Sequence, residues 1–247
     1  MDIENFKFRN SHGQELPARL YYNDRNNKRG VLFSHGLFSS KDGYKITQMA
    51  EYIVNAGYTL MTFDFTYSGE SPGDICDISV MQEVDDLLRA ADVFGEKGIE
   101  NVHLMGSSMG GVVSILAGSS EALSPESIML IATPLKFDGL IPADISDKEN
   151  EDDMVYISGV QVNKKFINEL KSLDVASAVE KITCPVLLIH GKLDAVVSFK
   201  DFEKIKKLLT TGCDSLLIED GDHNLTDEKH LNLIKEKVKN WLGKFVL

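Results

Sequence analysis

The amino-acid sequence predicts an α/β fold in which a mostly parallel central sheet is flanked by helices. Short, uninterrupted apolar runs recur along the chain, as in strands that are buried on both faces of a parallel sheet. Between most of these runs lie stretches with apolar residues at three- and four-residue spacing, which is typical of amphipathic helices. Strands and helices that alternate in this way build a parallel sheet through right-handed crossovers.

The individual elements follow from these patterns. A β-hairpin comes first, because alternating residues at 6–9 and 16–22 flank the turn-forming residues 10–13. The strands expected in the central sheet are residues 31–33, 59–63, 102–105, 128–131, 186–189 and 216–218. The helices expected around the sheet are residues 46–55, 80–94, 109–117, 199–209 and 231–241.

One interval, residues 135–173, contains no strand long enough for the central sheet. It combines the acidic stretch 144–153 with apolar and helical segments that need something to cover. A stretch of this length without a sheet strand is usually a lid or a binding insertion, although a long solvated loop is the simpler alternative. We therefore expect a core of residues 1–134 and 174–247 with a small cap insertion at 135–173.

Composition and charge narrow the class of protein. The chain has 247 residues and a net charge of −12, from 26 basic and 38 acidic residues, which argues against nucleic acid or an anionic membrane as a partner. No apolar run reaches membrane-spanning length, and the first residues lack the basic and apolar segments of a signal peptide. The cysteines, Cys76, Cys184 and Cys213, have no C-x-x-C spacing. They are expected to be reduced, buried thiols of a cytoplasmic protein that holds no metal.

The motif G-x-S-x-G at residues 106–110 directly follows the predicted strand 102–105 and begins a predicted helix. A serine on such a sharp strand-to-helix turn has a strained backbone and an exposed hydroxyl. Ser108 is therefore the candidate nucleophile. The backbone N–H of Met109, at the start of the helix, is an unpaired donor and a candidate for one half of an oxyanion hole.

A serine nucleophile needs a base and a group that orients the base. In this type of elbow the chain order is serine, acid, histidine. Asp194 lies in the loop after the strand 186–189, and His223 lies in the loop after the strand 216–218. These two residues are the predicted acid and base. The second oxyanion donor is expected from the loop after the strand 31–33, where Gly36 lets the chain turn and the N–H of Leu37 face Ser108.

Other histidines and acids fit the order less well. Among the acids, Asp220 is the next candidate after Asp194, and Asp64 is expected to bind its own local turn. His12 and His230 are expected in solvent, His103 and His190 as hydrogen-bonded packing residues, and His35 as a brace for the Gly36 loop.

Taken together, these segments resemble an α/β-hydrolase fold serine hydrolase over residues 31–241; the matching motifs are residues 35–36, 64–71, 106–110, 191–197 and 221–223. One departure concerns the usual segment D-x-R-G-x-G-x-S. Here it reads D-F-T-Y-S-G-E-S, so Thr66 replaces the arginine and Tyr67 the first glycine. The ion pair made by that arginine is expected to be absent.

The short cap and the His-Gly loop resemble small bacterial carboxylesterases that include feruloyl (cinnamoyl) esterases, and also monoacylglycerol lipases and a serine aminopeptidase-like group. The resemblance implies a Ser108–His223–Asp194 triad, hydrolysis through an acyl-enzyme and no cofactor. We predict a carboxylesterase that acts on a small-molecule ester, with homodimer formation left open.

Rival functions remain within and outside the enzymes. The same triad serves aminopeptidases, thioesterases and acyltransferases, because function lies in the site and not in the fold. A catalytically dead binding protein is disfavoured, because no triad member is missing. Under the aminopeptidase alternative, the acidic residues of the cap select a substrate that carries a cationic group, although we favour the interpretation that they only form a solvated face. These residues are Asp147, Glu149, Glu151, Asp152 and Asp153.

Overall fold

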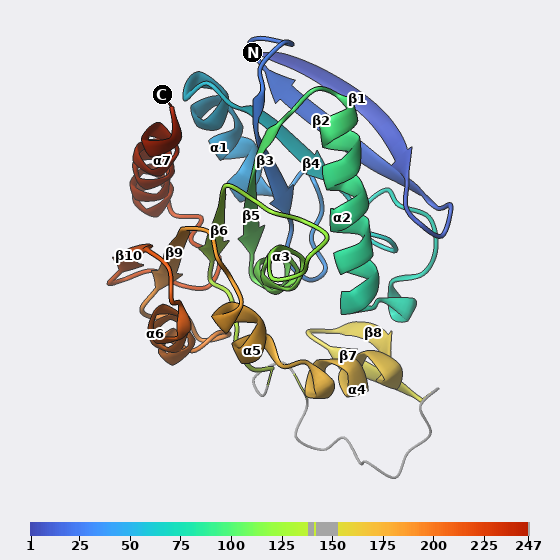
Figure 1. The fold of residues 1–247 in the computed structure, drawn as a ribbon. Coiled ribbons are helices and arrows are strands. Elements are labelled where there is room, and N and C mark those ends of the chain that lie inside the picture. Colours follow the sequence, from blue (N-terminus) through green and yellow to red (C-terminus); the bar gives the residue numbers. More distant parts are fainter. Residues whose placement is uncertain (138–140, 142–152, 247) are drawn as a thin grey trace.

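The computed structural model describes residues 1–137, 141 and 153–246 (Figure 1). Its strands are β1 (Asp2–Arg9), β2 (Glu15–Tyr22), β3 (Arg29–Ser34), β4 (Thr59–Phe63), β5 (Asn101–Ser107), β6 (Ser127–Ile131), β7 (Met154–Ile157), β8 (Val160–Asn163), β9 (Val186–Gly191) and β10 (Cys213–Ile218). The α-helices are α1 (Tyr44–Asn55), α2 (Val80–Glu96), α3 (Met109–Gly118), α4 (Lys164–Ser172), α5 (Val175–Glu180), α6 (Phe199–Leu208) and α7 (Glu228–Leu242). Short 3₁₀ turns, η1 (Ile75–Asp77) and η2 (Gly243–Phe245), complete the list.

The central sheet has eight strands in the order β1-β2-β4-β3-β5-β6-β9-β10. β1 pairs antiparallel with β2 and β2 antiparallel with β4, whereas every neighbouring pair from β4 to β10 is parallel. The predicted fold class, hairpin and sheet strands are confirmed. Every residue of β4, β6 and β9 is buried, as the uninterrupted apolar runs indicate for strands covered on both faces.

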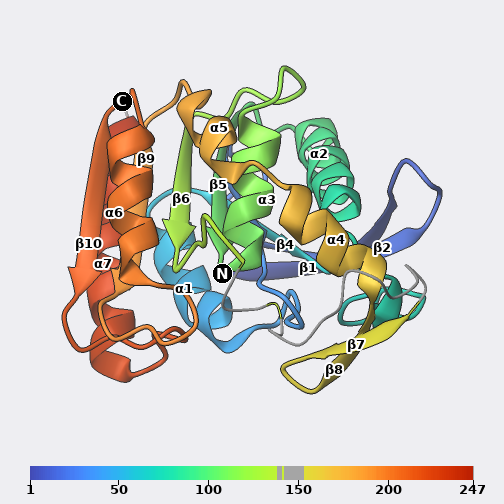
Figure 2. The same cartoon turned by 90° about the horizontal axis from the view of Figure 1, so that it is seen from below.

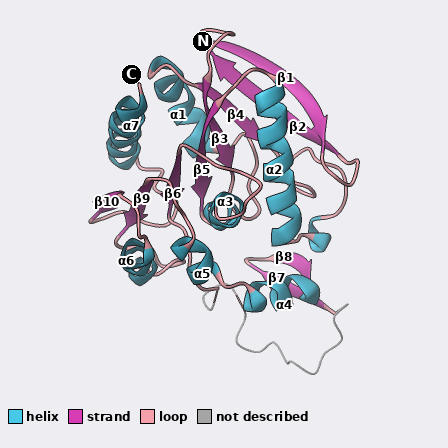
Figure 3. Cartoon of the chain, in the orientation of Figure 1, coloured by secondary structure: helices cyan, strands magenta, loops and turns pink. Residues whose placement is uncertain are grey.

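Helices cover both faces of the sheet, which gives a three-layer α/β/α arrangement (Figure 3). One apolar cluster joins the sheet to α1 and α7, with Trp241 and Ile53 among its buried residues. The other cluster joins the opposite face to α2, α3, α5 and α6, and extends to Phe166 and Ile167 of α4. Because the strands between β3 and β10 are parallel, their carboxyl ends meet at one edge of the sheet, where open α/β sheets build their sites.

The interval between β6 and β9 contains a separate two-stranded sheet, β7 and β8, followed by α4 and α5 (Figure 2). None of these described strands joins the central sheet, as expected, whereas α5 was not predicted. The acidic residues Asp147, Glu149, Glu151 and Asp152 lie outside the described residues. The division into a core and a cap at 135–173 stays a prediction.

One carboxylate ties α4 to the central layers. Glu169 of α4 accepts hydrogen bonds from the backbone N–H groups of Val80 and Met81, at 2.9 and 2.8 Å, and from the hydroxyl of Ser79, at 2.9 Å. Ser79 is itself the N-cap of α2. The first N–H groups of a helix have no intrahelical partner and carry partial positive charge. Glu169 therefore satisfies the amino end of α2 from another element.

We expect Glu169→Gln to lower the free energy of unfolding by about 1–2 kcal/mol, because charge-assisted bonds to the helix end are replaced by weaker neutral ones. Urea unfolding of the two proteins measures the difference. Glu51→Gln on the exposed face of α1 removes the same charge and is the matched control, expected within about 0.5 kcal/mol of the original. Equal unfolding midpoints for both variants would show that the Glu169 contact contributes nothing.

Candidate active site

Ser108 lies on a tight turn between β5 and α3. Its backbone has φ +54° and ψ −119°, a conformation that non-glycine residues rarely adopt. The turn is held from both sides: the Ser108 N–H donates to the carbonyl of Ile131 in β6 at 2.8 Å, and the N–H of Gly111 donates to the Ser108 carbonyl at 2.9 Å. A Cβ on Gly110 would collide with the backbone of Ser34 and His35. This glycine therefore allows α3 to pack directly against the end of β3.

Asp194 and His223 are brought together, as the sequence predicts, by the loops that follow β9 and β10. His223 Nδ1 lies 2.8 Å from Asp194 Oδ2. The other carboxylate oxygen of Asp194 accepts the backbone N–H groups of Val196 and Val197, both at 2.8 Å. The Asp194 side chain is fully buried, while that of His223 is 19% exposed. The aspartate is thus fixed in direction, and the histidine reaches the surface of a pocket.

The hydrogen bonds around Asp194 keep it ionised. Burial alone would raise the pKa of Asp194, but the bonds from His223 and from the backbone of Val197 and Val196 outweigh it and lower the pKa. His190 packs behind this pair with Nε2 3.5 Å from Asp194 Oδ2. Burial lowers the pKa of His190, so the ring is neutral, and its Nε2–H donates to the Val197 carbonyl at 3.1 Å. His190 is a hydrogen-bonded packing residue, as expected.

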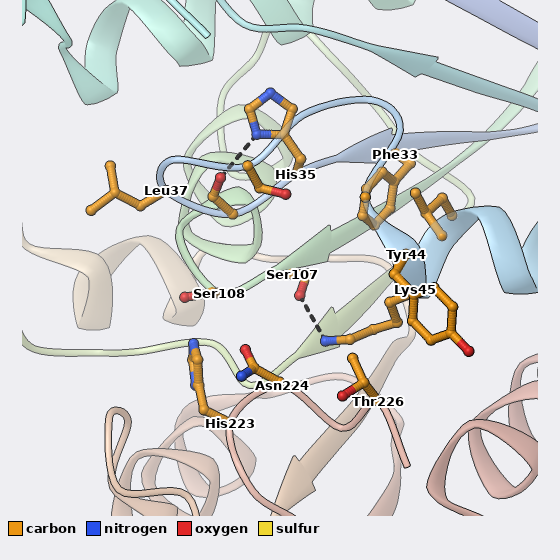
Figure 4. A pocket seen from close by; sticks show the side chains of 14 residues that line it. Phe33, His35, Leu37, Tyr44, Lys45, Ser107, Ser108, His223, Asn224 and Thr226 are labelled. Carbon is orange, nitrogen blue, oxygen red and sulfur yellow. Dashed lines mark hydrogen bonds between the residues drawn. The ribbon is translucent and has the colours of Figure 1, made fainter. Parts of the chain in front are cut away.

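Ser108 and His223 line the same pocket, which has a volume of about 270 Å³. Figure 4 shows the His223 ring directed toward Ser108. The pocket walls come from the loop after β3, the start of α1, the elbow and the loop after β10; the residues are Phe33, His35, Gly36, Leu37, Ser39, Gly43, Tyr44, Lys45, Ile46, Ser107, Ser108, His223, Asn224 and Thr226. Among the described residues, no part of 153–173 lines it.

The loop after β3 passes close to the elbow. A Cβ on Gly36 would lie 3.2 Å from the Ser107 carbonyl oxygen and 3.4 Å from Ser108 Cβ, so the next residue, Leu37, lies near Ser108. His35 braces this loop, as expected. Its Nδ1–H donates to the Gly36 carbonyl at 2.9 Å, and its Nε2 accepts the Phe65 N–H at 3.3 Å. Burial lowers the pKa of His35, which keeps Nε2 free to accept.

Asp220, the next candidate acid, and His230 bind each other, and neither lines the pocket that contains Ser108. Asp220 pairs with Lys229, and its Oδ1 lies 3.0 Å from His230 Nε2. The expectation that His230 lies in solvent is wrong: it is 5% exposed, because it faces inward from the first turn of α7. His103 is buried against Ser127 Oγ at 2.8 Å, as expected for a packing residue.

Asp64 is completely buried and binds its local turn, but it also has an ion-pair partner that sequence reasoning missed. Lys41, in the loop before α1, donates its backbone N–H and its ammonium to the two Asp64 oxygens, at 2.7 and 3.0 Å. The Glu70 N–H adds a third bond at 3.0 Å. Burial alone would lower the pKa of Lys41, but the hydrogen bonds to Glu70, Asp64 and Asp42 raise it. A cation 23 positions away thus neutralises Asp64 where the family arginine is absent.

The other replacements in this segment are also accommodated. Tyr67 has φ +66°, the left-handed conformation that glycine adopts without strain. Thr66 makes a different set of contacts: its N–H and hydroxyl donate to the buried carboxylate of Asp86, at 2.7 and 3.1 Å. The segment therefore keeps its turn through contacts with α2.

The cysteines form no disulfide, and each is half-buried where full burial was expected. Among the described residues, no cluster of three or more His, Cys, Asp or Glu side chains is arranged to hold a metal ion. No helix in the described part of the chain combines the length and apolar character needed to cross a membrane.

Known proteins that are similar to this chain in sequence include hydrolases. A family model described as serine aminopeptidase, S33, matches residues 25–147. The mouse palmitoyl-protein thioesterase ABHD10, mitochondrial, is 26% identical over 236 residues, which cover 89% of this chain and 77% of that protein. Human α/β hydrolase domain-containing protein 17B is 24% identical over 230 residues, covering 90% of this chain and 69% of that protein.

Solved structures share the fold at low sequence identity. Est1E from Butyrivibrio proteoclasticus with bound ferulic acid superposes with a TM-score of 0.86 at 21% identity, covering 96% of this chain and 97% of that one. Mouse ABHD10 gives a TM-score of 0.75 at 18% identity, covering 98% and 100%. The chain has the α/β-hydrolase fold, and it is an enzyme of the serine hydrolase class.

We expect Lys41→Met to lower the free energy of unfolding by about 3–5 kcal/mol, because it leaves the buried Asp64 carboxylate without its cation. Urea unfolding gives the value, and Lys7→Met, at an exposed lysine of β1, is the control for the loss of one positive charge. Replacing both partners, Lys41→Met with Asp64→Asn, is expected to recover part of the loss. A single Lys41→Met variant as stable as Lys7→Met would contradict the buried ion pair.

Proposed function

We propose that this protein is a carboxylesterase that hydrolyses its substrate through an acyl-enzyme on Ser108. The single observation that carries the proposal is the 2.8 Å bond between Asp194 and His223 in a pocket that also contains Ser108 on its strained turn. A serine, a buried carboxylate and a histidine in this chain order form the hydrolytic triad.

In the proposed mechanism His223 accepts the Ser108 proton at Nε2 as the serine oxygen attacks the ester carbonyl. Asp194 accepts the Nδ1–H bond, which fixes the tautomer and stabilises the imidazolium that forms. The N–H groups of Leu37 and Met109 bind the developing oxyanion, and each donor of this kind is worth about 10²–10³ in rate. Protonated His223 then releases the alcohol, and water removes the acyl group by the reverse steps.

The names of the relatives support esters and thioesters as the substrate class. Est1E was solved with ferulic acid bound, and ABHD10 is named a palmitoyl-protein thioesterase. A thioesterase is therefore the second candidate function. A pocket of about 270 Å³ suits a small acyl or alcohol group rather than a whole long acyl chain. We propose that residues 135–173 act as a cap that adds further binding surface.

The remaining expectations stay predictions: a cytoplasmic location, a small-molecule ester as the partner, and the oligomeric state. The mouse relative is named as mitochondrial, so its name gives no support to the cytoplasmic prediction.

We expect Ser108→Ala to lose ester hydrolysis by on the order of 10⁶ in kcat, as when a triad serine is removed in the subtilisin case. A fluorophosphonate probe should label the original protein on Ser108 and leave the variant unlabelled. Ser119→Ala, at the far end of the same helix, is the matched control and should be labelled and active. Labelling that persists in Ser108→Ala, or that maps to another serine, would assign the nucleophile elsewhere.

Asp194→Asn should keep the fold and lose turnover by about 10⁴, the size of the corresponding change in the serine protease case. Its remaining oxygen can still accept the Val196 and Val197 N–H groups, so its amide faces His223 Nδ1 and selects the wrong tautomer. Steady-state kinetics on 4-nitrophenyl butyrate measures the loss, with Asp220→Asn as the control. A large loss in Asp220→Asn together with an active Asp194→Asn would exchange the two roles.

A further inference from the structure

Lys45 places a positive charge in the wall of the pocket that contains the nucleophile. It lies in the first turn of α1, is half-buried, and lines the pocket together with Ser108 and His223. Its ammonium donates to the hydroxyl of Ser107 at 3.2 Å. Figure 4 shows the side chain directed from α1 toward the elbow, on the side of the pocket where Asn224 and Thr226 also lie.

This lysine has no carboxylate within 4 Å among the described residues. Asp222 and Asp194 act on it only at longer range. Lys41, in the loop before α1, is buried against three carboxylates, so the surroundings of the two lysines differ. A half-buried ammonium without a carboxylate partner lowers the stability of the fold. In this protein such a group lies next to Ser107 and Ser108. Burial lowers the pKa of Lys45 to about 8, so most molecules still carry the charge at pH 7.

We propose that Lys45 binds an anionic group of the substrate, so that the site takes esters with a carboxylate a few bonds from the scissile carbonyl. The proposal deepens the carboxylesterase function and rests on it. An ammonium has three N–H donors, of which Ser107 accepts one, and a carboxylate can accept the others. Ser107 and Ser108 are consecutive, and Lys45, Ser107 and Ser108 line the same pocket, so a substrate bound there can place its carboxylate at the ammonium and its ester carbonyl at Ser108.

Ser107 is a positioning residue in this arrangement. Its hydroxyl binds the Lys45 ammonium beside the elbow. Ser107 occupies the variable position before the serine in the G-x-S-x-G motif. The same charge disfavours the aminopeptidase alternative, because a free α-amino group near the scissile bond would meet a cation.

Hydrolysis of matched esters tests the proposal at pH 7. On the acyl side, monoethyl succinate, glutarate and adipate are compared with the corresponding diethyl esters. On the alcohol side, the butanoyl ester of glycolate is compared with its methyl ester. Released acid is quantified by chromatography, and the readout is the ratio of kcat/KM for the carboxylate-bearing ester to that for the neutral one. The arm with the higher ratio identifies which side of the ester faces Lys45.

In the original protein the ratio should exceed one in at least one arm. Lys45→Met keeps the length of the stem without the charge, and it should lower the ratio by about 10–100-fold, the value of a charge-assisted hydrogen bond. Lys45→Arg should retain part of the preference, and Ser107→Ala should lose part of it, through KM. Lys28→Met removes the same net charge at the opposite end of β3, and its ratio should be unchanged.

A ratio of one or less in both arms, or an equal loss on both members of each pair in Lys45→Met, would overturn the anion-binding role while ester hydrolysis stands. Fluorophosphonate labelling of Ser108 separates this result from a failure of the proposed function. If Ser108 is unlabelled and no ester is turned over, the carboxylesterase assignment fails and the substrate class fails with it.

Discussion

The backbone of Ser108 is held in a conformation that costs a non-glycine residue about 1–3 kcal/mol, and much of the surrounding structure serves to hold it there. The carbonyl of Ile131 anchors its N–H, and Gly110 lets α3 approach the end of β3 closely. These contacts exist only because β3, β5 and β6 are adjacent and parallel. The position of Ser108 therefore depends on the strands around it and not on the five-residue motif alone.

The charged side chains discussed around the elbow are of two kinds. Asp64 and Lys41 neutralise each other and fix the loops beside the elbow. Asp194 and Lys45 instead bind residues that line the pocket containing Ser108. Asp194 binds His223, and Lys45 binds Ser107. A fully paired charge adds to the definition of the fold. A charge whose partner lies in the pocket is free to respond to a substrate.

The sheet and the candidate triad were predictable because their signals are local. An apolar run marks each buried strand, and Asp194 and His223 each follow such a run within a few residues. The ion pair of Lys41 with Asp64 had no local signal, because the two residues are 23 positions apart and meet only in the folded chain. The burial of His230 was missed for a related reason: its partner Asp220 lies in the preceding loop, and only the docking of α7 encloses them.

Lys45 also shows how a local charge acts against the charge of the whole chain. A net charge of −12 repels anions at long range, but at physiological ionic strength such repulsion is screened beyond about 8 Å. A half-buried ammonium is screened much less, and it acts at contact distance, where the pocket excludes part of the water. For the proposed anionic substrate, the overall charge would therefore affect how fast it arrives, whereas Lys45 beside Ser107 would hold it in place for reaction. Under the proposed role of Lys45, substrate selection depends on a local positive charge that has no carboxylate within 4 Å among the described residues, in a chain whose net charge is negative.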